Sequence, residues 1–119
     1  MKMNGKRRVF RRITIRALVF QDGDWLSVRC LEYDLATQAR TLPRLYESLR
    51  TLILGHIAVR LHHNQRPFEG VKPAPPEYWE MFERSKIPLS DETRSFTPVK
   101  SSGFLVSPPK LRVAPPEAA

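Results

Sequence analysis

Residues 12–31 decide the fold, and they read Arg-Ile-Thr-Ile-Arg-Ala-Leu-Val-Phe-Gln-Asp-Gly-Asp-Trp-Leu-Ser-Val-Arg-Cys-Leu. Over residues 12–20, apolar side chains recur at every second position, and Arg12, Thr14 and Arg16 lie on the opposite side. This alternation of mainly β-branched residues is typical of a strand with one buried face. The residues of the predicted buried face are Ile13, Ile15, Ala17 and Val19.

A second strand follows directly. The dipeptide Asp22-Gly23 favours a two-residue hairpin turn, because both central residues of a type I′ turn need a positive φ. The alternation then resumes over residues 25–31, with Leu26, Val28 and Cys30 on one side. The sequence therefore predicts a β-hairpin.

Residues 32–34 make a polar break, and residues 35–40 are typical of a shorter third strand. Thr41 is a suitable N-cap for a helix, and Pro43 stands in the first turn, where a missing N–H costs little. The predicted helix reaches about His63. Its apolar residues follow the three-and-four spacing of a helix that packs on a sheet: Leu42, Leu45, Leu49, Leu52, Ile53, Ile57 and Leu61.

Three residues of this helix do not fit a single buried stripe. Leu54 and Val59 are apolar but lie outside it. We expect them to be covered by the C-terminal segment or by another subunit, which predicts a homodimer or larger homo-oligomer. Gly55 costs about 1 kcal/mol relative to alanine inside a helix, and this cost suggests close packing at that position.

The C-terminal half has a different character, because ten of the eleven prolines lie at or beyond Pro67. Residues 76–86 favour a short helix, with Pro76 at its start and an apolar side that docks on the core. That side consists of Tyr78, Trp79 and Phe82. Residues 85–109 are expected to be a linker, and residues 110–113 form a possible last strand.

Together these patterns predict an α+β fold. A three-stranded antiparallel sheet is packed by one long helix in the order β-β-β-α, and a short C-terminal helix and an extended Pro-rich tail follow. The predicted organisation is a basic arm over residues 1–11, one domain over residues 12–86 and the tail over residues 87–119.

The net charge of +8 is concentrated at the N-terminus. Seven of the 20 basic residues and none of the 12 acidic residues lie within residues 1–16, which leaves +1 for the rest of the chain. Such a block attracts phosphates, although it is also common as a solvated tail. Nucleic-acid contact is therefore an alternative function, through Lys6, Arg7, Arg8, Arg11 and Arg12.

Residues that often carry chemistry are present but poorly arranged for it. His56 and His63 share a helix face two turns apart, too far for one metal ion, and Cys30 lies on the apolar face of its strand. Glu32 and Asp34 bracket Tyr33 without other signs of a pocket. We expect no catalytic residues, no metal and no cofactor, and hence a protein that is not an enzyme.

Cellular location is indicated by composition. Cys30 is the single cysteine and cannot form an internal disulfide, which fits a reducing compartment. Arginines interrupt the N-terminal apolar residues, so no signal peptide is expected, and no stretch reaches the roughly 18 apolar residues of a membrane span. The expected location is the cytoplasm.

One segment resembles a known family. The residues are Cys30-Leu-Glu-Tyr-Asp-Leu-Ala-Thr-Gln38, followed by Thr41-Leu42 at the start of a helix, and preceded by Ala17–Phe20, a turn and Trp25. This pattern is similar to the HicB-like antitoxins over roughly residues 12–62. Two departures are Ala39, where many members have glycine, and Pro43-Arg44, where acidic residues usually open the helix.

The resemblance implies a partial RNase H-like β-β-β-α core, usually oligomeric. It also implies that the chain neutralises a small HicA-type, mRNA-cleaving toxin through protein contact. No C-terminal DNA-binding domain is evident in the Pro-rich tail, so a stand-alone interaction module without a toxin is a further alternative. The hypothesised partner-binding residues are Trp25, Tyr33, Asp34, Leu54 and Val59.

Overall fold

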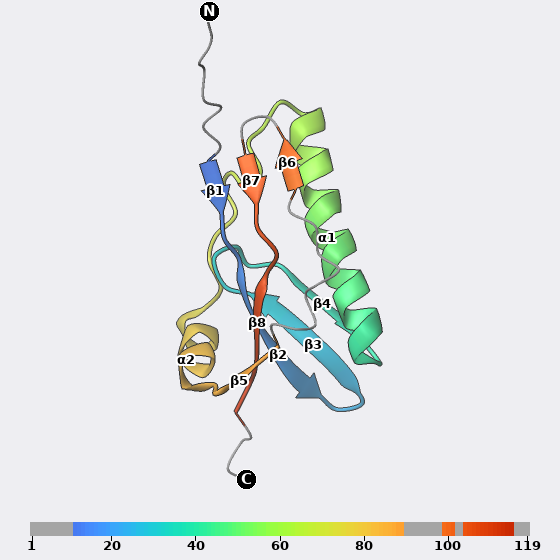
Figure 1. Cartoon of the computed structure of the whole chain (residues 1–119), viewed down its shortest axis with the longest axis vertical. Coiled ribbons are helices and arrows are strands. Elements are labelled where there is room, and N and C mark those ends of the chain that lie inside the picture. Colours follow the sequence, from blue (N-terminus) through green and yellow to red (C-terminus); the bar gives the residue numbers. More distant parts are fainter. Residues whose placement is uncertain (1–10, 90–98, 102–103, 116–119) are drawn as a thin grey trace, which may run out of the picture.

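Two helices lie on opposite sides of a twisted sheet in a mixed α+β fold (Figure 1). The computed structural model describes residues 11–89, 99–101 and 104–115. The helices are α1 (Leu42–His62) and α2 (Pro76–Arg84). The strands are β1 (Arg11–Ile13), β2 (Arg16–Asp22), β3 (Trp25–Cys30), β4 (Ala36–Ala39), β5 (Ile87–Pro88), β6 (Val99–Ser101), β7 (Phe104–Val106) and β8 (Lys110–Val113).

The main sheet has five strands in the order β4-β3-β2-β8-β5. The prediction that this sheet has three strands is therefore wrong. Strand β8 pairs in parallel with β2, from Arg16 opposite Lys110 to Val19 opposite Val113, and β5 pairs antiparallel with β8. The alternation at residues 110–113 did predict a strand. Its place in the main sheet, more than 90 residues from β2, leaves no mark in local periodicity.

The hairpin between β2 and β3 is confirmed, but its turn differs from the prediction. Asp22 pairs with Trp25, so the two central residues are Gly23 and Asp24. Gly23 has a φ of +62°, and Asp24 is not among the residues with positive φ. A positive φ at the first central residue alone is the pattern of a type II′ turn, not of type I′.

A second, smaller sheet has the order β1-β7-β6. It continues the parallel contact of β2 with β8, because β1 pairs in parallel with β7. Two residues separate Ile13 from Arg16, whereas three separate Val106 from Lys110, so the register shifts by one residue between the sheets. The extra residue lies in the segment 107–109 between β7 and β8. Pro108 and Pro109 in this segment have no N–H group to donate to a neighbouring strand. Strands β5, β6 and β7 also correct the expectation of a linker over residues 85–109.

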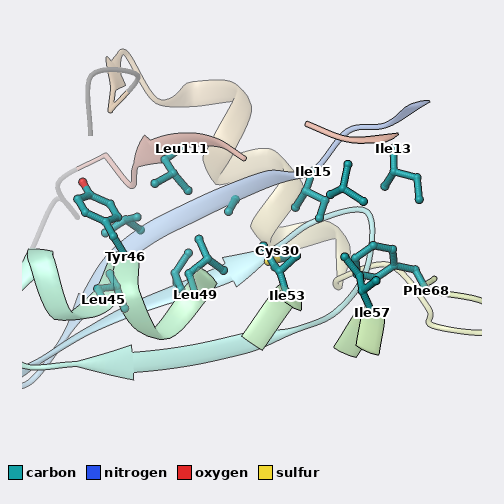
Figure 2. Packing of buried hydrophobic residues seen from close by; sticks show 14 of the residues in the cluster. Ile13, Ile15, Cys30, Leu45, Tyr46, Leu49, Ile53, Ile57, Phe68 and Leu111 are labelled. Carbon is teal, nitrogen blue, oxygen red and sulfur yellow. The ribbon is translucent and has the colours of Figure 1, made fainter. Parts of the chain in front are cut away.

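Helix α1 covers one face of the main sheet and confirms the predicted helix. The Thr41 hydroxyl accepts a hydrogen bond from the Arg44 N–H at 3.4 Å, as expected of an N-cap. Figure 2 shows the side chains of α1 in one layer with Cys30 and Leu111 of the sheet and with Ile15, which lies between β1 and β2. Each fully buried leucine or isoleucine contributes roughly 1.5–3 kcal/mol. The buried residues of α1 are Leu45, Tyr46, Leu49, Ile53 and Ile57.

Gly55 corrects the expectation of close packing in α1. A Cβ atom added to this residue would have no other heavy atom within 4 Å. Its side of the helix therefore has room for a larger side chain.

Helix α2 covers the opposite face of the sheet, so β2 and β3 are buried on both sides. Leu18 and Leu31 are fully buried there against Ala74 and Phe82. Docking of α2 on the core was predicted, but the sequence pattern indicated only one buried face for the first strand. Among the described residues, no helix combines the length and apolar character that a membrane span needs.

Candidate functional site

The five residues proposed to bind a partner lie in three separate places. Trp25 begins β3 and is 37% exposed, with the Arg40 guanidinium 4.5 Å from its ring centroid. Leu54 is half-buried on α1, and Val59 on the same helix is 59% exposed.

Tyr33 and Asp34 lie between β3 and β4, and both have intramolecular partners. The Tyr33 ring stacks on Phe68 with centroids 4.3 Å apart. Asp34 receives two hydrogen bonds from Arg29, at 2.6 and 2.9 Å, and this contact raises the pKa of Arg29. Burial raises the pKa of Tyr33, and the nearby charge of Glu32 adds to the effect.

Glu32 and Asp34 are held by different arginines that also fasten α2 to the sheet. Arg16 binds Glu32 at 2.6 Å and lies 4.7 Å from the Trp79 ring centroid. Arg29 binds Asp34, lies 4.5 Å from the Tyr78 ring centroid and donates to the Tyr78 hydroxyl at 3.1 Å. These contacts give both guanidinium groups a carboxylate and an aromatic partner, which explains how a strand face that contains Arg16 and Arg29 packs against a helix.

The histidines and the cysteine have structural surroundings. Nε2 of His56 accepts a hydrogen bond from the Phe68 N–H, and burial followed by the charge of Arg60 lowers the pKa of His56. His62 and His63 are exposed at the end of α1. Burial raises the pKa of Cys30 to about 12, which disfavours a reactive thiolate. The described parts of the chain contain no cluster of three or more such side chains that could hold a metal ion.

An open strand edge is the feature that the list of partner-binding residues missed. Within the part of the chain that the structure describes, β4 is the last strand on its side of the sheet (Figure 1). The Leu35 carbonyl accepts a hydrogen bond from the Cys30 N–H at 2.8 Å, one position beyond the pairing of Arg29 with Ala36. Antiparallel pairs alternate between bonded and non-bonded. Thr37 and Ala39 are therefore bonded to β3, and the N–H and C=O groups of Ala36 and Gln38 point outward.

A shallow cavity of about 380 Å³ lies beside this edge. Its floor combines Thr37 of β4 with Glu47, Ser48, Thr51 and Leu52 of α1. A strand added to β4 would place alternate side chains over this cavity. The run Ala36-Thr-Gln-Ala39 contains neither proline nor charge, so nothing in it blocks pairing with another strand.

Of the residues proposed to contact nucleic acid, Arg11 and Arg12 lie on β1, and both are exposed. Lys6, Arg7 and Arg8 lie outside the described residues, as does the rest of the predicted arm before Arg11.

Comparison with known proteins gives no relative. No family model matches the chain, and no curated protein or solved structure does either. The functional argument therefore rests on the residues and geometry of this chain.

Proposed function

We propose that this chain is a protein-binding module of the HicB-like antitoxin kind, which neutralises a small HicA-type toxin by direct contact. The observation that carries the proposal is the open edge of β4, where the backbone groups of Ala36 and Gln38 point outward. An exposed edge binds a partner strand through main-chain hydrogen bonds, and neighbouring side-chain cavities supply specificity.

The two outer edges of the main sheet differ in a way that favours β4. Strand β5 has only two residues, one of them Pro88, and Lys86 precedes it. Short length, proline and lysine are the usual means by which proteins prevent strand pairing. Strand β4 has four residues and none of these features.

The order of elements supports the HicB-like part of the proposal. Strands β2, β3 and β4 are consecutive and antiparallel, and α1 follows at once and packs on them. This is the β-β-β-α order that the resemblance implies for a partial RNase H-like core. The segment between β3 and α1, where the resemblance is strongest, contains the open edge.

The test changes one outward N–H group. Gln38→Pro removes that donor and leaves the bonds of Thr37 and Ala39 to β3, because proline is tolerated on edge strands where its nitrogen faces solvent. Gln38→Thr is the matched control, since it keeps the N–H group. The proposal requires a HicA-type protein encoded beside this gene, and binding to that protein is measured by titration calorimetry, with melting curves to check folding.

We expect Gln38→Pro to weaken binding by about tenfold, the equivalent of one hydrogen bond of roughly 1.4 kcal/mol, and Gln38→Thr to have little effect. Equal affinities for the two folded variants would exclude the β4 edge. Absence of binding by the unchanged protein to any HicA-type neighbour would contradict toxin neutralisation itself.

A further inference from the structure

A second candidate binding site lies at the end of the molecule away from the hairpin turn, and it has a different chemistry. A cavity of about 610 Å³ opens between β1, β7, the turn that follows β3 and the loop that follows α1. Its volume is within the range of about 300–1,000 Å³ that is usual for ligand sites. The lining residues that matter here are Arg11, Tyr33, Arg66, Phe68, Glu69 and Phe104.

The aromatic wall of the cavity is held in place by the fold. Phe68 stacks with two rings, that of Tyr33 with centroids 4.3 Å apart and that of His56 with centroids 4.7 Å apart. The φ of Phe68 is 64°, a conformation that is uncommon for a bulky residue and costs about 1 kcal/mol or more. Its N–H donates to His56, which offsets part of that cost. Phe68 is only 3% exposed, so the half-buried rings of Tyr33 and Phe104 are the ones that can meet a ligand.

The backbone on the cationic side of the cavity is also held in place. The Arg66 N–H donates to the Glu69 carboxylate at 3.2 Å, and the Glu69 N–H donates to the Arg66 carbonyl at 3.1 Å. This closed turn sets the backbone from which the Arg66 side chain extends. On the other side, Arg11 is held by the pairing of β1 with β7, opposite Phe104.

Arg11 and Arg66 differ from the arginines of the sheet faces. Arg16 and Arg29 each bind a carboxylate at 2.6 Å. Within the described residues, no carboxylate forms an ion pair with the side chain of Arg11 or Arg66. Guanidinium groups without an acidic partner are suited to bind phosphate oxygens.

From this combination we infer that the cavity binds single-stranded nucleic acid. A base stacks on Tyr33 or Phe104, and adjacent phosphates contact Arg11 and Arg66. Stacking rings beside cations are the usual means of binding unpaired bases. A polyanion fits better than an isolated phosphate, because Arg12 follows on β1 and Lys2, Lys6, Arg7 and Arg8 precede Arg11 in the sequence. This site is separate from the β4 edge and does not depend on the proposed protein partner.

The probe is a fluorescein-labelled oligouridine of about 12 nucleotides, within the usual range of single-strand site sizes. Binding to the full chain is followed by anisotropy at several salt concentrations. Arg66→Gln removes a cation of the cavity, and Arg50→Gln removes an exposed cation of α1 as the matched control. Phe104→Leu keeps an apolar side chain but removes the stacking face.

We expect Arg66→Gln to weaken binding by about tenfold and to reduce the slope of log affinity against log salt by about 0.7, the value for one lost phosphate contact on a single strand. Arg50→Gln should change the affinity less than about twofold, and Phe104→Leu should weaken binding by about tenfold through lost stacking.

Three results would overturn the inference. No binding at low salt rejects it outright. Equal losses for Arg66→Gln and Arg50→Gln mean that the attraction is diffuse. If a duplex of the same length, or polyglutamate, binds as tightly as oligouridine, unpaired bases have no role. The cavity is then only a cationic surface that any acidic macromolecule would bind. Melting curves of each variant establish that these changes are not losses of fold.

Discussion

His56 and Phe68 connect helix α1 to the loop that follows it. Nε2 of His56 accepts a hydrogen bond from the Phe68 N–H at 3.2 Å, and the two rings stack with centroids 4.7 Å apart. The bond requires an unprotonated Nε2, because a protonated imidazole offers only donors. The position of Phe68 therefore depends on neutral His56. The same holds for the aromatic wall of the cavity that Arg11 and Arg66 line.

This relationship predicts a pH dependence of stability. Burial lowers the pKa of folded His56 below its ordinary value of 6.5, so the unfolded chain takes up the proton first as the pH falls. The contribution of His56 is complete above pH 6.5 and is lost as the pH falls toward the folded pKa. We expect the free energy of unfolding to decrease over this range in urea titrations.

The matched variants for this prediction are His56→Gln and His62→Gln. Glutamine at residue 56 keeps an acceptor but does not titrate, so the decrease between pH 6.5 and 5 should become smaller. His62 is exposed, and its replacement should leave the decrease unchanged. An unaltered profile for His56→Gln would show that other groups cause it.

Gly55 provides a prediction about stability alone. It lies in the middle of α1, and an added Cβ atom meets nothing within 4 Å. Gly55→Ala should therefore stabilise the protein by about 0.5–1 kcal/mol, the difference in helix propensity and chain entropy. Ala58→Gly, at another exposed residue of α1, should destabilise it by a similar amount. A destabilising Gly55→Ala in thermal or urea unfolding would mean that a second copy packs closely on this side of the helix.

The local elements of this fold could be predicted from the sequence, because their signals are local. Alternation identified the strands around Val19 and Val28, although the single strand predicted over residues 12–20 is divided at Thr14 and Ile15 into β1 and β2. The three-and-four spacing from Leu45 to Ile57 identified α1. The exposure of β4 could not be predicted, since it depends on which strand is last in the sheet. The place of β8 beside β2 is equally non-local, and the brief alternation at Lys110–Val113 carries no information about its partner.

The candidate sites were predictable only in part, for a related reason. Tyr33 and Asp34 were proposed from the sequence as partner-binding residues, but the residues they contact, Phe68 and Arg29, come from other elements. Arg11 was identified from the basic run, whereas Arg66 and Phe104 reach the same cavity from distant parts of the chain. A single sequence shows which residues are unusual but does not show which of them meet.

Trp79 tests the contribution of α2. Its indole N–H donates to the Ala74 carbonyl at 3.2 Å, and its ring packs against the cluster around Leu18 and under Arg16. Because Trp79 is half-buried, Trp79→Ala should cost about 2 kcal/mol, less than the roughly 3–5 kcal/mol of a fully buried tryptophan. Glu80→Ala changes an exposed residue of the same helix and serves as the control. A melting temperature equal to that of the unchanged protein would indicate that α2 is not docked in solution.

The last prediction concerns self-pairing of the β4 edge when no other partner is present. Only Ala36 and Gln38 point their backbone groups outward, so two antiparallel copies bond if Ala36 lies opposite Gln38 of the second copy. This register is symmetric about Thr37, which then faces its own copy as a non-bonded pair with Cα atoms about 4.5 Å apart.

Thr37→Cys should therefore form a disulfide-linked dimer under mild oxidation, because about 4.5 Å between Cα atoms is within disulfide range. Gln38→Cys is the control, because residue 38 faces Ala36 of the second copy. The Cα atoms of residue 38 in the two copies are about 8 Å apart, beyond the limit of about 7 Å for a disulfide. Cys30 is buried and should not react in either variant. The linked dimer occupies the edge proposed for the toxin strand, so it should lose toxin binding and regain it on reduction. Cross-linking that is equally fast for both variants, or toxin binding that persists in the linked dimer, would place the partner elsewhere on the chain.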